Sequence, residues 1–166
     1  DLTAPTFMQN SQRLSLMTRT LRETPKKKSG FITSASARNR SNSMSGDFAY
    51  YNANVEKVEE EDCVCRAISL GLSLPYRAVE KILQIVSFYY GCDPLQLCCY
   101  HHIMEDIFGF PVRYCNKGET VGEIAEMYPN NKVIIRIDGH LTCSVHGVIY
   151  DIWRCNEKEV DCYWII

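Results

Sequence analysis

Four short apolar runs, three of them joined by two-residue turns, occupy the C-terminal part of the chain and restrict its fold. The runs cover residues 132–137, 140–145, 148–153 and 160–165, and the turns are Asp138-Gly139 and His146-Gly147. Apolar runs joined in this way are typical of antiparallel β-hairpins. Helical patterns precede them, at residues 63–70, 73–89, 93–108 and 120–128. Helices followed by an antiparallel β-meander predict an α+β domain.

Residues that favour helix ends mark the limits of the predicted helices. The expected start signals are Asp62, the Asp93-Pro94 pair with Gln96, and the capping box of Thr120 and Glu123. Gly71 and Gly109 are the expected ends of the first and third helices. We expect these N-terminal helices to pack on the meander.

The composition changes near residue 48. Residues 1–48 are rich in Ser, Thr, Asn and Arg, and they hold eight basic and three acidic side chains, a net charge of +5. Because the whole chain carries −2, the remainder carries −7. A polar segment of this kind does not bury enough surface to fold alone. We therefore expect an extended basic arm at residues 1–48 and one α+β domain at residues 49–166.

Three interpretations of this arm remain open. It is a solvated or partner-bound tail without chemistry of its own, or its basic groups at positions 26–28, 38 and 40 meet phosphates or an acidic protein surface. An Arg- and Ser-rich, acid-poor segment also fits an organelle transit peptide in composition.

The chain holds nine cysteines, an odd number without the regular spacing of a disulfide framework. We expect most of them to be small buried thiols in a reducing compartment. The N-terminus lacks the apolar stretch of a secretory signal, and no apolar run approaches the roughly 18 residues of a membrane span. We therefore expect no membrane association.

The turn at His146-Gly147 determines which side chains share a face of the predicted hairpin. A two-residue turn pairs His140 with Trp153 and places Asp151 on the same face as a diagonal neighbour of His140, about 7–8 Å away at Cα. An imidazole and a carboxylate can form a hydrogen bond across that distance. Asp151 would then orient His140 for proton transfer, and Trp153 would shield the pair from water.

Cys63 is the nucleophile that such a base would activate. It follows Asp62 at an expected helix start, where the helix dipole and free N–H groups favour a thiolate. A Cys-His pair oriented by Asp is a complete activated-nucleophile set. Cys65 is expected to point into the core. Arg66 is placed to pair with a local carboxylate or with a substrate, and a salt bridge on the helix surface is the favoured interpretation.

Five motifs occur in order along the domain. They are Tyr50-Tyr51-Asn52-Ala53-Asn54, Asp62-Cys63-Val64-Cys65-Arg66-Ala67-Ile68-Ser69, Gly139-His140-Leu141-Thr142, Gly147-Val148-Ile149-Tyr150-Asp151-Ile152-Trp153 and Tyr163-Trp164. In this order and spacing they resemble small papain-like cysteine-peptidase-type proteins of tailed bacteriophages and their bacterial hosts. The resemblance covers about residues 49–166. It implies a papain-like fold with Cys63 as nucleophile, His140 as base and Asp151 as the orienting group.

The chain departs from the papain-like pattern just before Cys63. Papain-like enzymes usually carry a Gln there as an oxyanion-hole donor, and this chain has none. Asn52 or Asn54 is the expected substitute, together with the backbone N–H of Cys63. The acidic residues at positions 59–62 would raise the pKa of a thiolate.

Two functions fit these features. The first is a thiol-dependent amide hydrolase of phage type, a cysteine peptidase or isopeptidase-like enzyme that acts on a protein or peptide. The second is a structural or delivered virion protein that keeps the papain-like fold with little or no turnover. Its arm would dock on virion or host proteins or on packaged nucleic acid. Either function places the protein in the host cytoplasm or in the virion.

Four possible metal ligands lie close together on one predicted helix: Cys98, Cys99, His101 and His102. A zinc site needs further ligands, such as Cys92 or Cys115, and the usual C-x-x-C spacing is missing. Ordinary helix packing is the favoured interpretation. The chain also has no Walker A or Gly-x-Gly-x-x-Gly pattern. We expect neither a metal nor a cofactor.

Overall fold

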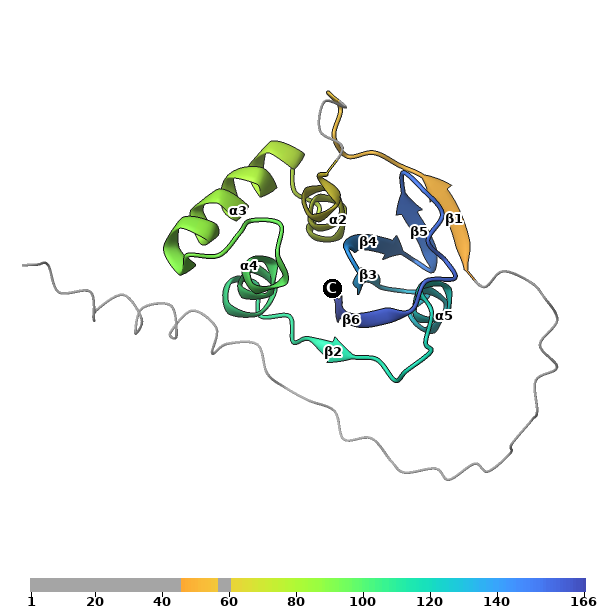
Figure 1. Ribbon diagram of the computed structural model, residues 1–166. Helices are drawn as coiled ribbons and strands as arrows, with labels where there is room; N and C mark the ends of the chain where they lie inside the picture. The colour runs from red at the N-terminus through yellow and green to blue at the C-terminus, as the bar shows by residue number, and fades with distance from the viewer. Residues whose placement is uncertain (1–45, 57–60) are drawn as a thin grey trace, which may run out of the picture. The chain divides into compact units, whose positions relative to one another are not determined.

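The computed structural model describes residues 46–56 and 61–166, whose helices and strands are shown in Figure 1. These residues belong to one compact unit, Arg40–Ile166. Almost all of the expected basic arm, residues 1–45, lies outside the described residues, so its predicted docking and phosphate-binding roles lie outside them too. The first strand begins at Asp47, slightly before the expected start of the domain at residue 49.

Within the described residues, six strands form one mixed sheet in the order β1-β5-β4-β3-β6-β2. The strands are β1 (Asp47–Tyr50), β2 (Arg113–Tyr114), β3 (Lys132–Ile137), β4 (His140–Val145), β5 (Val148–Asp151) and β6 (Val160–Ile165). The predicted antiparallel meander is confirmed for β3, β4 and β5. The predicted bounds hold for β3, β4 and β6, whereas β5 ends at Asp151 rather than at residue 153.

The two edges of the sheet differ from a simple meander. Strand β1 runs parallel to β5 and occupies its outer edge, which makes the sheet mixed. Strand β6 therefore lies on the other side of the β3–β4 hairpin, antiparallel to β3, and carries the short strand β2 on its outer edge. Inside the meander, Val145 pairs with Val148, the register expected from a two-residue turn.

Helices cover both faces of this sheet. They are α2 (Cys63–Leu72), α3 (Tyr76–Tyr90), α4 (Leu97–His102) and α5 (Val121–Met127), and a π-helical turn, Ile103–Ile107, continues α4. Helices α2, α3 and α4 lie on one side of the sheet and α5 on the other (Figure 1). None of the helices within the described ranges is long and apolar enough to cross a membrane.

Strand β3 shows why the sheet needs cover on both faces. Its Ile134 belongs to the core formed with α2, α3 and α4. Val133, Ile135 and Ile137 belong to a second core, formed with α5. All four side chains are buried, and near-continuous apolar runs of this kind are characteristic of strands buried on both faces.

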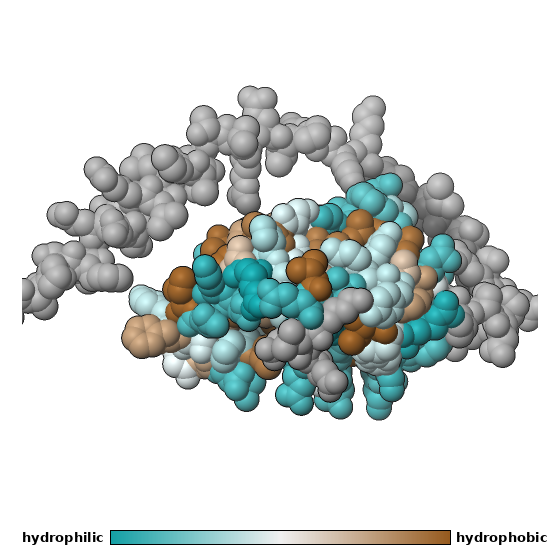
Figure 2. Space-filling model, turned by 90° about the horizontal axis from the view of Figure 1, so that it is seen from above, coloured by the Kyte–Doolittle hydropathy of each residue, from teal (hydrophilic) through white to brown (hydrophobic). Residues whose placement is uncertain are grey.

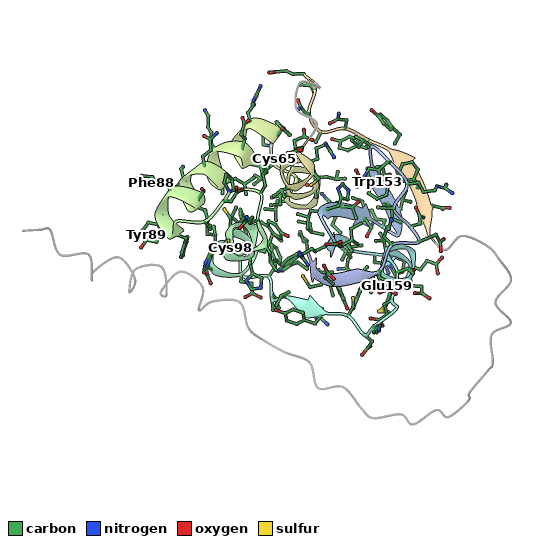
Figure 3. The ribbon with its side chains drawn as sticks, in the orientation of Figure 1. Cys65, Phe88, Tyr89, Cys98, Trp153 and Glu159 are labelled. Carbon is green, nitrogen blue, oxygen red and sulfur yellow. The ribbon has the colours of Figure 1, made fainter. Side chains whose placement is uncertain are left out.

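Helix α3 is amphipathic, as its sequence pattern predicts. Val79, Leu83 and Val86 are buried against the core. Phe88 and Tyr89 are exposed, and they point away from the sheet in Figure 3. The face of the molecule in Figure 2 mixes hydrophobic and hydrophilic side chains in small groups.

The end of α2 differs from the prediction that Gly71 is its C-cap. The helix continues through Gly71, and Ser73 adopts the left-handed conformation, with φ of 55°. Gly71 is needed for another reason, because a Cβ at this position would lie 2.6 Å from Cδ1 and Cγ1 of Ile134. The glycine thus allows the helix backbone to approach β3 closely.

The start of α4 also differs from the prediction. The Asp93 carboxylate accepts a hydrogen bond of 2.8 Å from the N–H of Leu95, which closes a turn rather than capping a helix. The helix begins after Gln96, whose side chain makes no capping hydrogen bond. In contrast, the predicted capping box of Thr120 and Glu123 is confirmed at the start of α5.

Candidate active site

Helix α2 begins at Cys63 and carries its half-buried thiol to the start of β4. The ring of His140 and the backbone of Leu141 and Val64 are the neighbours that lower the pKa of this thiol. Ile68 of α2 and Leu141 of β4 lie in the same apolar core. Packing of the helix on the sheet therefore sets the contact between Cys63 and His140.

The β4–β5 hairpin holds His140 against Asp151. Nε2 of His140, at the first position of β4, lies 2.7 Å from Oδ2 of Asp151, at the last position of β5. Oδ1 of Asp151 accepts a hydrogen bond of 2.7 Å from the N–H of Ile152. Because Nε2 faces the carboxylate, Nδ1 is the nitrogen available to Cys63. The structure brings the three predicted residues together in the order Cys63, His140, Asp151.

The charges of this site favour an ion pair between the thiol and the imidazole. Burial raises the pKa of Cys63, but its contacts with His140, Leu141 and Val64 outweigh burial and lower the pKa below its ordinary value. Burial lowers the pKa of His140, but its hydrogen bonds with Asp151 and Cys63 outweigh burial and raise the pKa to about 9. A lowered thiol pKa beside a raised imidazole pKa favours thiolate and imidazolium at neutral pH.

The other thiols of the chain behave differently. All nine cysteines lie within the described residues, and all are free thiols. Burial raises the pKa of Cys65 to about 11, and that side chain is buried in the core as predicted. The pKa is raised in the same direction, with burial as the largest cause, for Cys98, Cys99, Cys115, Cys143, Cys155 and Cys162. The contact with His140 thus sets Cys63 apart from these thiols.

Trp153 lies beside the His140–Asp151 pair, as the hairpin register predicts. Its ring centroid is 5.1 Å from that of His140, with 54° between the ring planes. The indole remains 38% exposed, whereas the His140 side chain is only 12% exposed. The ring therefore covers part of the His140–Asp151 pair and leaves its own outer side open to solvent.

Arg66 differs from the prediction of a surface salt bridge. It is 6% exposed and forms an ion pair with Asp62. Its Nη2 also lies 3.8 Å from Oδ1 of Asp151. The reason for its burial is its place on α2, one turn after Cys63, where the helix faces the end of the hairpin. Asp62 stands at the N-cap position but makes no capping hydrogen bond, because its carboxylate is engaged with Arg66.

Asn54 contacts Asp62, the residue that precedes Cys63. Its Nδ2 donates a hydrogen bond of 3.0 Å to Oδ2 of Asp62, and it is 2% exposed. Asn52 accepts a hydrogen bond of 2.9 Å from the N–H of Asn54. Asn54 is the expected oxyanion donor or a supporting residue, and this geometry corresponds to support of Asp62.

Two clefts meet at Cys63 and His140. One, of about 220 Å³, is lined mostly by apolar side chains together with Gln96 and Arg136. The other, of about 380 Å³, extends toward Glu61 and Trp153. A substrate bound across the site would therefore have room on both sides of the nucleophile.

Gln96 is a candidate functional residue that the sequence analysis missed. It lines the same cleft as Cys63, although it follows the nucleophile in the chain. A Gln side-chain N–H is a suitable oxyanion donor. The sequence signal that could have identified this residue is a Gln at the start of a predicted helix. The sequence analysis interprets this Gln only as part of a capping box.

The possible zinc ligands are engaged elsewhere. The Cys99 thiol contacts the carbonyl of Leu83, with S and O 3.6 Å apart. His102 stacks on Tyr90, and its Nδ1 lies 2.6 Å from Asp106. Within residues 46–56 and 61–166, no group of three or more His, Cys, Asp or Glu side chains is placed to hold a metal ion.

The site contains the parts of an activated nucleophile: a thiol of lowered pKa, an imidazole that can carry its proton, and a buried carboxylate that orients the imidazole. Such a set can attack an acyl carbon and protonate a leaving group. Comparison with protein-family models, with curated proteins and with solved structures found no match for this chain.

Proposed function

We propose that this protein is a thiol-dependent amide hydrolase of the papain-like, phage-associated type, a cysteine peptidase or isopeptidase-like enzyme. The observation that carries the proposal is the arrangement of Cys63, His140 and Asp151, in which His140 shares a cleft with Cys63 and its Nε2 lies 2.7 Å from Oδ2 of Asp151. The pKa shifts of two of these groups support it. The pKa of Cys63 is lowered, and the pKa of His140 is raised to about 9. A buried cysteine without a basic partner shifts upward instead, as Cys65 does, with a pKa raised by burial to about 11.

The proposed reaction uses these groups in two steps. The Cys63 thiolate attacks the substrate carbonyl and forms a C–S bond, while His140 gives its proton to the leaving amine. Water then attacks the thioester, with His140 as the base, and releases the acid and the Cys63 thiol. Asp151 keeps Nδ1 of His140 directed at Cys63 through both steps.

The negative oxygen formed in each step needs hydrogen-bond donors. The candidates are the backbone N–H of Cys63 and the side-chain amide of Gln96, which lines the same cleft. The apolar side of that cleft includes Leu97, Ile137 and Leu141. This composition suits a protein or peptide substrate with an apolar side chain next to the scissile bond.

Site-resolved alkylation, measured by mass spectrometry between about pH 5 and about pH 9, tests the proposal. With iodoacetamide, we expect Cys63 to react well below pH 8, roughly the onset of ordinary thiol reactivity, and to lose that advantage in His140→Ala. Cys98 is the internal control, because it is exposed but its pKa is raised. If Cys63 reacts no faster than Cys98 at neutral pH, the proposal fails.

The charge asymmetry of the sequence favours a second candidate function. Residues 1–48 carry +5 and the remainder −7, so the protein would also serve as a delivered or structural virion component that docks through its arm. Deletion of residues 1–45 tests this role. Loss of assembly with unchanged Cys63 reactivity supports docking, whereas a salt-sensitive loss of nucleic-acid binding assigns the arm to phosphates.

A further inference from the structure

Arg66 lies between two buried carboxylates, only one of which belongs to the candidate catalytic set. On one side it forms an ion pair with Asp62, and on the other its Nη2 is 3.8 Å from Oδ1 of Asp151. Asp151 uses its other oxygen, Oδ2, for His140. Arg66, Asp62 and Asp151 are each at most 6% exposed.

A row of alternating charges therefore crosses the site. It runs from the Asp62 carboxylate through the Arg66 guanidinium and the Asp151 carboxylate to the His140 ring. Burial lowers the pKa of Arg66, and the charge of Asp151 acts in the opposite direction. Tyr76 and Tyr50 act on the pKa of Arg66 in the same direction as Asp151. Glu61, Cys63 and His140 line the same cleft as Arg66. Buried charges of this kind persist only when they are paired.

The far end of the row is fixed to the protein by hydrogen bonds. Oδ2 of Asp62 accepts a hydrogen bond of 3.0 Å from Nδ2 of Asn54 and one of 3.1 Å from the hydroxyl of Tyr76. These contacts hold Asp62, and through it the guanidinium, in one position. A planar guanidinium can face two carboxylates at once, which a lysine ammonium does less well.

Without a cation at this position, two buried carboxylates would lie near each other in a poorly solvated region. Like charges and burial both favour the protonated form of a carboxyl group. A protonated Asp151 would no longer support the imidazolium of His140, and the thiolate of Cys63 would lose its counterion. The guanidinium thus acts on the nucleophile through Asp151 and His140.

We propose that Arg66 is a positioning residue of the active site, which keeps Asp151 ionised and oriented toward His140 while Asp62 serves as its counterion. This inference rests on the proposed function, because it assigns a role within the same triad. A purely structural alternative exists: Arg66 serves only to neutralise Asp62 at the start of α2.

A charge-balanced double variant separates the two roles. Arg66→Met alone leaves Asp62 without its partner and would disturb the site in either case. Arg66→Met with Asp62→Asn removes both charges of the pair and keeps an amide that can bond Asn54 and Tyr76. If Arg66 serves only Asp62, the double variant recovers the wild-type site. If Arg66 acts on Asp151, it does not.

The measurement is the pH profile of Cys63 alkylation by iodoacetamide on the full chain, with thermal melting as a check of folding. We expect the double variant to alkylate about tenfold or more slowly near pH 6.5, with the Cys63 profile displaced by about one pH unit toward that of an ordinary thiol. A folded double variant with the wild-type profile would overturn the inference.

If the double variant does not fold, the Arg66→Lys variant provides the test instead. Lysine keeps the positive charge but not the planar guanidinium that faces both carboxylates. We therefore expect alkylation of Cys63 near pH 6.5 to slow by about threefold or more at an unchanged melting temperature. An unchanged rate would overturn the inference. Failure of the proposed function looks different, since wild-type Cys63 itself would then show no advantage over Cys98.

Discussion

Nε2 of His140 lies 2.7 Å from Oδ2 of Asp151, across the two strands of one hairpin. The contact is diagonal, because Val145 pairs with Val148 and every later pair follows from that turn. It fixes the ring so that Nδ1 remains for the Cys63 thiol. The orientation of the base therefore depends on hairpin register, whereas its distance from the nucleophile depends on how α2 packs on β4.

Asp151→Asn should weaken the activation of Cys63 without unfolding the domain. The amide keeps the shape of the side chain but cannot balance an imidazolium, so the pKa of His140 falls and that of Cys63 rises. We expect Cys63 alkylation near pH 6.5 to slow by about tenfold or more. Asp106→Asn is the matched control, since its carboxylate also contacts a histidine, His102, at 2.6 Å. Equal rates in wild type and Asp151→Asn would contradict the orienting role.

His140 should remain protonated well above the pH at which histidines usually lose their charge. Its raised pKa of about 9 has two causes that can be removed one at a time, the contacts with Asp151 and with Cys63. In Cys63→Ala the thiolate is absent, so the imidazolium loses a counterion and should release its proton at lower pH. An NMR titration of the ring, assigned by comparison with His140→Ala, measures both midpoints. A midpoint near 6.5 in the wild type would contradict the ion pair.

The pairing of His140 with Asp151 and the helix start at Cys63 were predictable because each depended on local rules. A two-residue turn allows one register, and that register alone placed His140, Asp151 and Trp153 on one side of the hairpin. The helix start at Cys63 was marked by the change of pattern after Asp62. Neither step required knowledge of distant parts of the chain.

The surroundings of the triad could not be predicted in the same way. The burial of Arg66 depends on the hairpin end that covers it, and the contact of Asn54 with Asp62 depends on the path of the loop after β1. Gln96 enters the cleft because the Asp93 turn delays α4. These features result from contacts between segments far apart in sequence. Neither the hydrophobic periodicity nor the composition of the sequence indicates such contacts. Strand β1 was missed for the same reason, since its partner is the free edge of β5.

Gln96→Ala should slow turnover while leaving the nucleophile intact. If the side-chain amide stabilises the oxyanion, its loss lowers kcat by about 10²–10³-fold. Alkylation of Cys63 forms no oxyanion, so its rate should stay at the wild-type value. Hydrolysis of an activated ester and iodoacetamide labelling, measured on the same preparations, give both quantities. Gln84→Ala, on the exposed side of α3, is the control. A parallel loss of both rates would show that Gln96 supports the fold of the site instead.

Gly71→Ala should destabilise the protein, although helix propensity alone predicts the opposite. In an exposed helix interior the change from Gly to Ala stabilises by about 1 kcal/mol. At Gly71 the new methyl group would lie 2.6 Å from Cδ1 and Cγ1 of Ile134, a fully buried side chain of β3. Overpacking of this kind costs about 1–3 kcal/mol. Urea unfolding should therefore show a lower midpoint for the variant.

Ile134→Ala provides the test of this cause. Alone it should cost about 2–5 kcal/mol, because it leaves a cavity between α2 and the sheet. Combined with Gly71→Ala, it gives the new methyl group the space that Ile134 filled, so the double variant should be more stable than the sum of the single effects predicts. Additive losses would mean that Gly71 acts through the backbone conformation of α2 and not through its approach to β3.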